Sequence, residues 1–358
     1  MAEKIKLGGA LALVVLVICY PEQSISSALT AMGVWAGTFA PALFPFFVVL
    51  PALGCEEAKA IYKRLFGRLM DRAFGVPGEA AGAVAVALMA GSPAGAIALS
   101  KVKGGMTGAQ ASRCAILCGG LSPAFLVASV GGALLGSPEI GRRLMVAQLL
   151  SILASGWLLR GAWQDDAQRL PGGREGEPGR RAAGTGGPSE EGERVHPVRE
   201  AVGNVLVVCG WMVLFSVVAG LVAAVLPGAR DKVLPLLEVA GGCHAISEMP
   251  LEMGVKCLVI AFFCGLGGIC VALQNHAAMP EVPMARLALG KLMHATLSAL
   301  FAGLLCARPI WAGGESAPVL ENALWLAGAS VLVVLGLARG ERRRPPSKPL
   351  PQGGVRAK

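Results

Sequence analysis

The sequence contains few charged and few aromatic residues. Only 15% of its 358 residues are Asp, Glu, Lys or Arg and only 5% are Phe, Trp or Tyr, whereas 54% are hydrophobic. A soluble domain of this length could not bury so much apolar surface, so the composition excludes an ordinary soluble globular protein. We therefore predict an all-α, polytopic membrane protein.

The sequence also lacks the common signatures of enzymes and metal sites. It has neither the phosphate-binding pattern G-x-x-x-x-G-K-[ST] nor the nucleophile elbow G-x-S-x-G. Its four histidines and ten cysteines do not follow metal-ligand spacing. We predict no enzymatic activity, no cofactor and no metal site, and we attribute the cysteines to apolar packing.

Apolar stretches long enough to cross a bilayer recur along the chain. After a first helix that ends near Tyr20, we predict crossings at residues 31–53, 114–136, 143–163, 201–227, 254–276, 285–307 and 321–339. Two further segments, 79–100 and 232–248, contain helix breakers and are predicted to be broken or re-entrant. The expected fold has about eight transmembrane helices plus these two broken segments.

The positions of Lys and Arg predict the orientation of the chain. Basic residues gather before the first helix, within residues 56–72 and in the C-terminal tail, which places both ends of the chain in the cytoplasm. This bias accounts for the net charge of +9 without a nucleic-acid partner, and anionic lipid headgroups are the expected partner of the basic tail. Arg142 and Arg143 fit poorly, because they fall in a loop expected outside.

A polar linker divides the chain into two membrane halves. Between Asp165 and Glu200 the sequence has eight acidic residues, six arginines, eight glycines and four prolines, a composition typical of disorder. The predicted regions are an N-terminal membrane half at 1–163, the linker at 164–200, a C-terminal membrane half at 201–339 and a basic cytoplasmic tail at 340–358. Helix breakers in both halves make them candidate repeats of a transporter.

Helix breakers and polar residues inside the apolar segments mark the candidate site. Proline leaves a carbonyl of the preceding turn without a partner, and a carboxylate at mid-membrane costs roughly 2.5–3.5 kcal/mol. The candidate substrate- or ion-binding residues are Glu238, Ser92, Pro93, Ser122, Pro123, Gly241, Gly242, Gly267, Gly268 and Gln274.

Each of these assignments has a structural alternative. Glu238 is a ligand, a member of a salt bridge, or a residue near the membrane interface. The Ser-Pro pairs are half-helix ends that face a solute, or simple proline kinks. Gly267 and Gly268 belong to a helix break or to a close helix crossing, and Gln274 marks the membrane surface or the mouth of a cavity.

The order of these motifs resembles the family of the sporulation integral membrane protein YlbJ, which is grouped with the nucleoside-recognition, or Gate, domain proteins. The resemblance rests on Tyr20-Pro21-Glu22, Phe39 to Phe47, Gly91 to Ala96, Leu121 to Phe125, Pro235 to Val239 and Gly265 to Gly268. Where the family usually has Gly-Tyr-Pro-x-Gly-Ala-Lys, this chain has Gly91-Ser92-Pro93-Ala94-Gly95-Ala96-Ile97.

The resemblance implies a membrane protein of endospore formation, located in the mother-cell or forespore membrane and required for the spore cortex. It implies no particular substrate, since a shared fold does not transmit one. We expect a transporter or gated pore for a small polar solute or ion. The alternative is a non-transporting scaffold of the sporulation machinery, whose partners are further copies of the chain or other sporulation membrane proteins.

Overall fold

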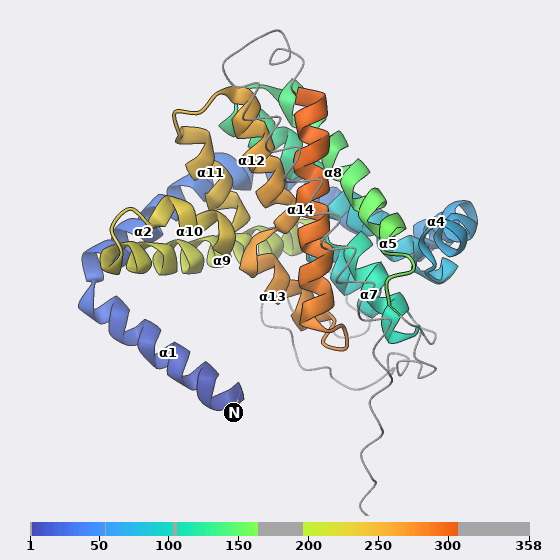
Figure 1. Cartoon of the computed structure of the whole chain (residues 1–358), viewed down its shortest axis with the longest axis horizontal. Coiled ribbons are helices and arrows are strands. Elements are labelled where there is room, and N and C mark those ends of the chain that lie inside the picture. The colour runs from blue at the N-terminus through green and yellow to red at the C-terminus, as the bar shows by residue number, and fades with distance from the viewer. Residues whose placement is uncertain (1, 54, 103–105, 164–195, 307–358) are drawn as a thin grey trace, which may run out of the picture.

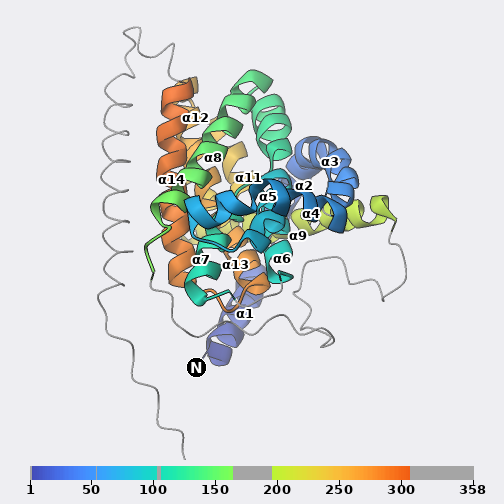
Figure 2. The ribbon, with the colours of Figure 1, turned by 90° about the vertical axis from the view of Figure 1, so that its right-hand side faces the viewer.

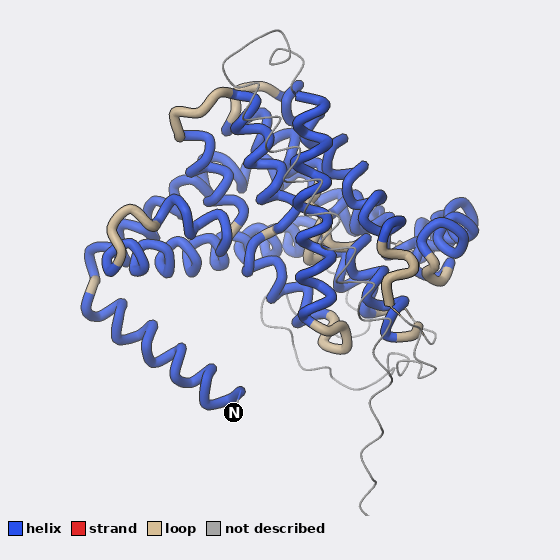
Figure 3. The backbone as a smooth tube through the Cα atoms, in the orientation of Figure 1, coloured by secondary structure: helices blue, strands red, loops and turns tan. Residues whose placement is uncertain are grey.

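The computed structural model describes residues 2–53, 55–102, 106–163 and 196–306. In these ranges the chain is helical, without strands, and its connections are short (Figure 3). The all-α prediction is therefore confirmed. The crossing predicted at 321–339, the tail at 340–358 and most of the linker lie outside the described residues.

The N-terminal helices form one side of the molecule together with a long helix from the second half. They are α1 (Ala2–Cys19), α2 (Pro21–Val34), the π-helical turn η1 (Trp35–Phe39), α3 (Ala40–Leu53) and α9 (Pro197–Val225). α9 begins inside the predicted linker and packs along α2 and α3, whereas α1 extends away from the rest of the molecule (Figure 1). Ser216 Oγ donates to the Ser27 carbonyl at 3.0 Å, which joins α9 to α2.

The remainder of the first half consists of short helices followed by one long helix. They are α4 (Glu56–Leu69), the π-helical turn η2 (Met70–Phe74), a 3-10 turn at Gly78–Ala80, α5 (Ala81–Ala90), α6 (Ala94–Ser100), α7 (Gly108–Leu117), the π-helix η4 (Phe125–Leu134) and α8 (Pro138–Leu158). The segment 79–100 is broken at Gly91–Pro93, as predicted. The segment 114–136 is also interrupted, between Leu117 and Pro123.

The second half supplies the helices that complete the core. They are α10 (Arg230–Leu237), α11 (Val239–Glu248), α12 (Met253–Leu266), α13 (Gly268–Ala278) and α14 (Met284–Cys306). α14 packs against α12 and α8, and the three helices run side by side in both views (Figures 1 and 2). A buried apolar cluster of both halves includes Phe39 and Phe125, whose rings stack 5.4 Å apart, an arrangement worth about 0.5–1.5 kcal/mol beyond the buried area.

Four helices among the described residues are long and apolar enough to cross a membrane. They are Pro21–Ala52, Pro197–Val225, Met253–Ala278 and Met284–Cys306. The predicted crossing at 254–276 corresponds to α12 and α13, which Gly267 interrupts. The count of eight crossings and the repeat of two halves remain predictions.

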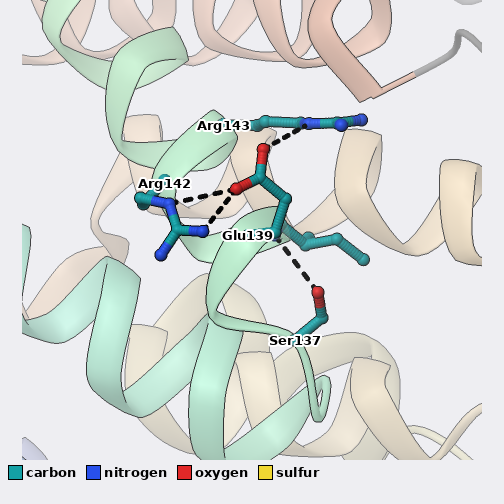
Figure 4. A network of polar contacts seen from close by, with 5 residues as sticks. Ser137, Glu139, Arg142 and Arg143 are labelled. Carbon is teal, nitrogen blue, oxygen red and sulfur yellow. Dashed lines mark hydrogen bonds and ion pairs between the residues drawn. The ribbon is translucent and has the colours of Figure 1, made fainter.

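The prediction that Arg142 and Arg143 lie in a loop is wrong. Both are in the first turns of α8, where Glu139 receives hydrogen bonds from Arg142 Nε at 3.0 Å and from Arg143 Nε at 3.3 Å (Figure 4). These two arginines, Arg142 first, hold the pKa of the exposed Glu139 carboxyl below its ordinary value. The Glu139 carboxylate thus offsets part of the positive charge of the two arginines, which the predicted orientation places outside the cytoplasm.

Candidate functional site

Glu238 lies at the break between α10 and α11, as the sequence predicts. Its backbone is extended, and its side chain caps α11 by accepting hydrogen bonds from Ala240 N at 2.7 Å and Gly241 N at 2.6 Å. A carboxylate at a helix N-terminus also interacts favourably with the helix dipole. The chain therefore places the charge where backbone groups stabilise it.

Glu238 is buried, and no cationic side chain in the described part of the protein pairs with it. It is 5% exposed and is the only buried carboxylate among the side chains that the structure describes. No Lys, Arg or His of the described residues forms an ion pair with it. Among the described residues Glu238 therefore forms no salt bridge, and its carboxylate keeps acceptor capacity for another group.

A cavity of about 370 Å³ lies next to Glu238, between α2, α9, α10 and α11. Its polar lining residues are Thr30, Ser216, Arg230, Glu238, His244 and Glu248. Glu248 is exposed whereas Glu238 is buried, so the cavity runs from the surface to the helix break. The Arg230 Nε is buried without a hydrogen-bond partner among the described residues. The cavity thus offers acceptors at its inner end and a cationic donor at its wall.

Gly241 and Gly242 shape this break in different ways. Gly241 lines the cavity, and a Cβ built on it would lie 3.2 Å from Glu238 Oε2. A Cβ on Gly242 would lie 2.4 Å from the Cα of Pro235, a contact that backbone atoms cannot relieve. Glycine at 242 therefore lets α11 fold back closely against α10.

The two Ser-Pro breaks contact each other and not the Glu238 cavity. Ser92 N donates to the Gly120 carbonyl at 2.8 Å, and a Cβ on Gly91 would lie 2.4 Å from Ser122 N. Ser122 Oγ accepts from Phe125 N at 3.2 Å and so begins the next helix. The Ser92–Pro93 peptide bond is cis, and Pro123 borders a separate water-sized cavity. One backbone N–H of the first break is thus satisfied by a carbonyl of the second.

Gly267 and Gly268 form the break between α12 and α13, and Gly268 packs against the backbone next to Glu238. Both have positive φ, 76° and 72°, which favours glycine. A Cβ on Gly268 would lie 3.0 Å from the carbonyl oxygen of Leu237 and 3.2 Å from Glu238 N. Gln274 lies apart from the cavity and donates to Cys270 Sγ of its own helix at 3.1 Å.

The sequence prediction missed Lys291 on α14, a buried lysine that is 8% exposed. Its Nζ donates to the Gly119 carbonyl oxygen, at the break that follows α7, and lies 3.1 Å from where a Cβ on Gly267 would be. It was also missed that Asn275 Oδ1 accepts from Ser92 Oγ. The rule that singles out Glu238, an ionisable group inside an apolar segment, applies equally to Lys291.

The four helix breaks therefore meet in the interior of the molecule. The Gly120 carbonyl joins the break after α7 to the break at Gly91–Pro93, and Leu237 joins the Glu238 break to the break at Gly267 and Gly268. Lys291 contacts both the break after α7 and Gly267. No group of three or more His, Cys, Asp or Glu side chains that could hold a metal occurs in the described part of the chain.

Comparison with known proteins gives one curated relative. The chain is 24% identical to the sporulation integral membrane protein YlbJ of Bacillus subtilis (strain 168) over 298 residues, which cover 74% of this chain and 72% of that protein. No protein-family model matches the chain. No solved structure matches it either. The match to YlbJ confirms the family resemblance that the order of motifs indicates.

Proposed function

We propose that the protein is a transporter-like membrane protein or gated pore for a small polar solute or ion, with Glu238 as its charged ligand. The supporting observation is that this buried carboxylate has no cationic partner among the described residues and lies at the inner end of a 370 Å³ cavity. Broken helices whose ends contact a polar cavity are typical of solute and ion sites in transporters. The proposal involves no enzymatic step.

The cavity chemistry favours a solute or ion that carries a cationic or hydrogen-bond-donating group. Both oxygens of Glu238 already accept backbone N–H groups, and such pre-oriented acceptors suit a cation or a donor. Arg230 supplies one cationic group to the wall, so a solute that also has an acceptor would find a partner there. The volume lies within the range of small-molecule sites.

The name of the relative adds a biological setting to the proposal. We propose that the chain acts in endospore formation, in the mother-cell or forespore membrane, and that its loss impairs the spore cortex. The proposed partners are anionic lipid headgroups, other sporulation membrane proteins and further copies of the chain.

The test is the yield of heat-resistant spores from a deletion strain of the source organism that carries wild type, E238Q or E248Q. Glu248 is the matched control, because it lines the same cavity but is exposed. We expect E238Q to lose the spores at an unchanged membrane level and E248Q to keep most of them. Full spore yield with E238Q would refute the ligand role and favour the scaffold.

A binding assay separates transport from other sporulation roles. Purified wild type and E238Q are heated in Li⁺, Na⁺, K⁺ or NH₄⁺ against choline at equal ionic strength. A cation that binds only the folded state stabilises it by about 2.7 kcal/mol at one hundred times its Kd. We expect one cation to raise the unfolding temperature of wild type and not that of E238Q.

A further inference from the structure

Lys291 and His294 form a second buried polar site, separate from the Glu238 cavity. They lie one turn apart on α14 and are 8% and 1% exposed. Lys291 Nζ donates to the Gly119 carbonyl, which belongs to the break after α7, so an ammonium group lies at the negative end of that short helix. No carboxylate of the described residues pairs with Lys291.

A small cavity next to this pair has room for one water molecule. It measures about 10 Å³ and is lined by Asn275, Lys291 and His294 among apolar residues and glycine. Neither ring nitrogen of His294 has a hydrogen-bond partner within the described ranges. Buried polar groups without partners are costly, and a polar cavity of this size accommodates a bridging water.

The site is in contact with the Glu238 break through two glycines. Lys291 Nζ lies against Gly267, and the next residue, Gly268, lies against the backbone of Leu237 and Glu238. If the hydrogen bond from Lys291 to the break after α7 weakens, the resulting movement is therefore transmitted through Gly267 and Gly268 to the backbone of Glu238, which lines the cavity.

We propose that Lys291, His294 and one bridging water form a proton-binding site that is coupled to the Glu238 cavity. As the pH rises, an Nζ–H bond of the Lys291 ammonium breaks and its proton passes through the water to solvent. Lys291 becomes a neutral amine, while His294 stays neutral and accepts a hydrogen bond from the water. The ammonium then no longer strengthens the hydrogen bond to Gly119, and the break after α7 loosens.

Other ionisable groups around Lys291 limit the alternatives. The helices packed against α14 carry the buried Arg113 and Cys114 on α7, Cys257 and Cys264 on α12 and Cys270 on α13, and Cys118 directly follows α7. α8 contributes buried polar residues that do not ionise, namely Gln148, Ser151 and Ser155, and Gln148 Nε2 donates to Ser298 Oγ at 2.6 Å and to the Ala261 carbonyl at 3.0 Å. Glu238 is the buried carboxylate of the neighbouring break. His294 is therefore the ring that shares this small cavity with Lys291.

The experiment is hydrogen–deuterium exchange of the purified protein without solute, from mildly acidic to alkaline pH, corrected for intrinsic amide chemistry. The reporter amides are Cys118, Gly119 and Ser92, which donate to Cys114, Ile116 and Gly120. The variants are K291R, which keeps a permanent charge, K291M, H294Q and the control K256M. Lys256 Nζ also donates to a helix-end carbonyl, that of Ser247 at 2.7 Å, but is only half-buried.

We expect protection in wild type and K256M to fall as the pH rises and protection in K291R to be independent of pH. In K291M the reporters should exchange at least about tenfold faster at every pH, the effect of losing a charged hydrogen bond. H294Q should move the pH at which protection changes. If K291M does not fold, the comparison of wild type with K291R decides.

The proposal is overturned if wild type and K291R share one pH dependence, or if K291M keeps full protection. An unchanged transition in H294Q removes His294 from the site and also contradicts the proposal. The inference rests on the proposed transport function only where it couples the Lys291 site to the Glu238 cavity. Because exchange is measured without a solute, failure of this site and failure of transport are distinguishable.

Discussion

Replacing Gly242 by alanine should destabilise the protein through one steric contact. The added Cβ would lie 2.4 Å from the Cα of Pro235, 2.9 Å from its Cβ and 3.1 Å from its nitrogen. Because these atoms belong to the backbone and the ring of α10, no rotamer change can relieve the contact. α10 and α11 would have to separate, and this movement would widen the break that holds Glu238.

The expected cost is that of overpacking a core, about 1–3 kcal/mol. For a chain of this size, about 2 °C per kcal/mol predicts a fall in unfolding temperature of roughly 2–6 °C. The assay is the thermal unfolding of purified protein in one detergent at a fixed scan rate, because membrane proteins often unfold irreversibly.

Two other glycines provide matched controls for the same substitution. A Cβ on Gly33 of α2 would meet nothing within 4 Å, so G33A should gain up to about 1 kcal/mol from helix propensity. A Cβ on Gly241 meets side-chain atoms of Glu238 and Leu234 at 3.2 Å and 3.4 Å and no backbone atom at closer range, so G241A should fall between the two. Equal unfolding temperatures for G242A and G33A would refute the steric argument.

Two further predictions concern sites away from the cavity. The lowered pKa of Glu139 means that its ion pairs stabilise the folded protein above about pH 4.5 and are lost as the pH falls through the lower pKa of the folded state. E139Q should therefore have a lower unfolding temperature than wild type at neutral pH and the same one in strong acid. A difference that persists in acid would contradict this. The sulfur atoms of Cys243 and Cys264 lie 3.6 Å apart. Molecular iodine should therefore take two electrons from the two thiols and form a disulfide between α11 and α12, which peptide mass spectrometry detects in wild type and not in C243S. Recovery of reduced peptides alone would contradict the geometry.

The helix breaks were predictable from sequence because proline, glycine and a buried charge act locally. Pro93, Pro123 and Gly267 lie at helix ends, where the missing N–H of proline or the positive φ of glycine acts locally, whereas two prolines remain inside α3. Glu238 was identified for the same reason, because an ionised group in an apolar stretch needs a compensating environment. These residues mark where the helices stop.

The contacts between the breaks were not predictable. Ser92 bonds Gly120 and Asn275, residues that are 28 and 183 positions away, and nothing in the local pattern of either segment specifies the other. Gly33 and Gly242 look alike in sequence, yet one faces open space and the other a proline backbone. Lys291 went unnoticed inside a stretch predicted as a continuous crossing, since a long lysine side chain can often reach the membrane surface.

The two membrane halves, although separated by a polar linker, share one set of polar contacts. In hydrocarbon every interrupted helix must find partners for its backbone groups within the protein. Here the breaks of the first half are completed by Asn275 and Lys291 of the second, and Gln148 of α8 donates to Ala261 and Ser298. Each half would leave unpaired groups if it inserted alone. The helix breaks are therefore stable only in the assembled protein. Only Gly267 and Gly268 separate the Glu238 backbone from the Lys291 ammonium group, so a shift at one charged residue can displace the other.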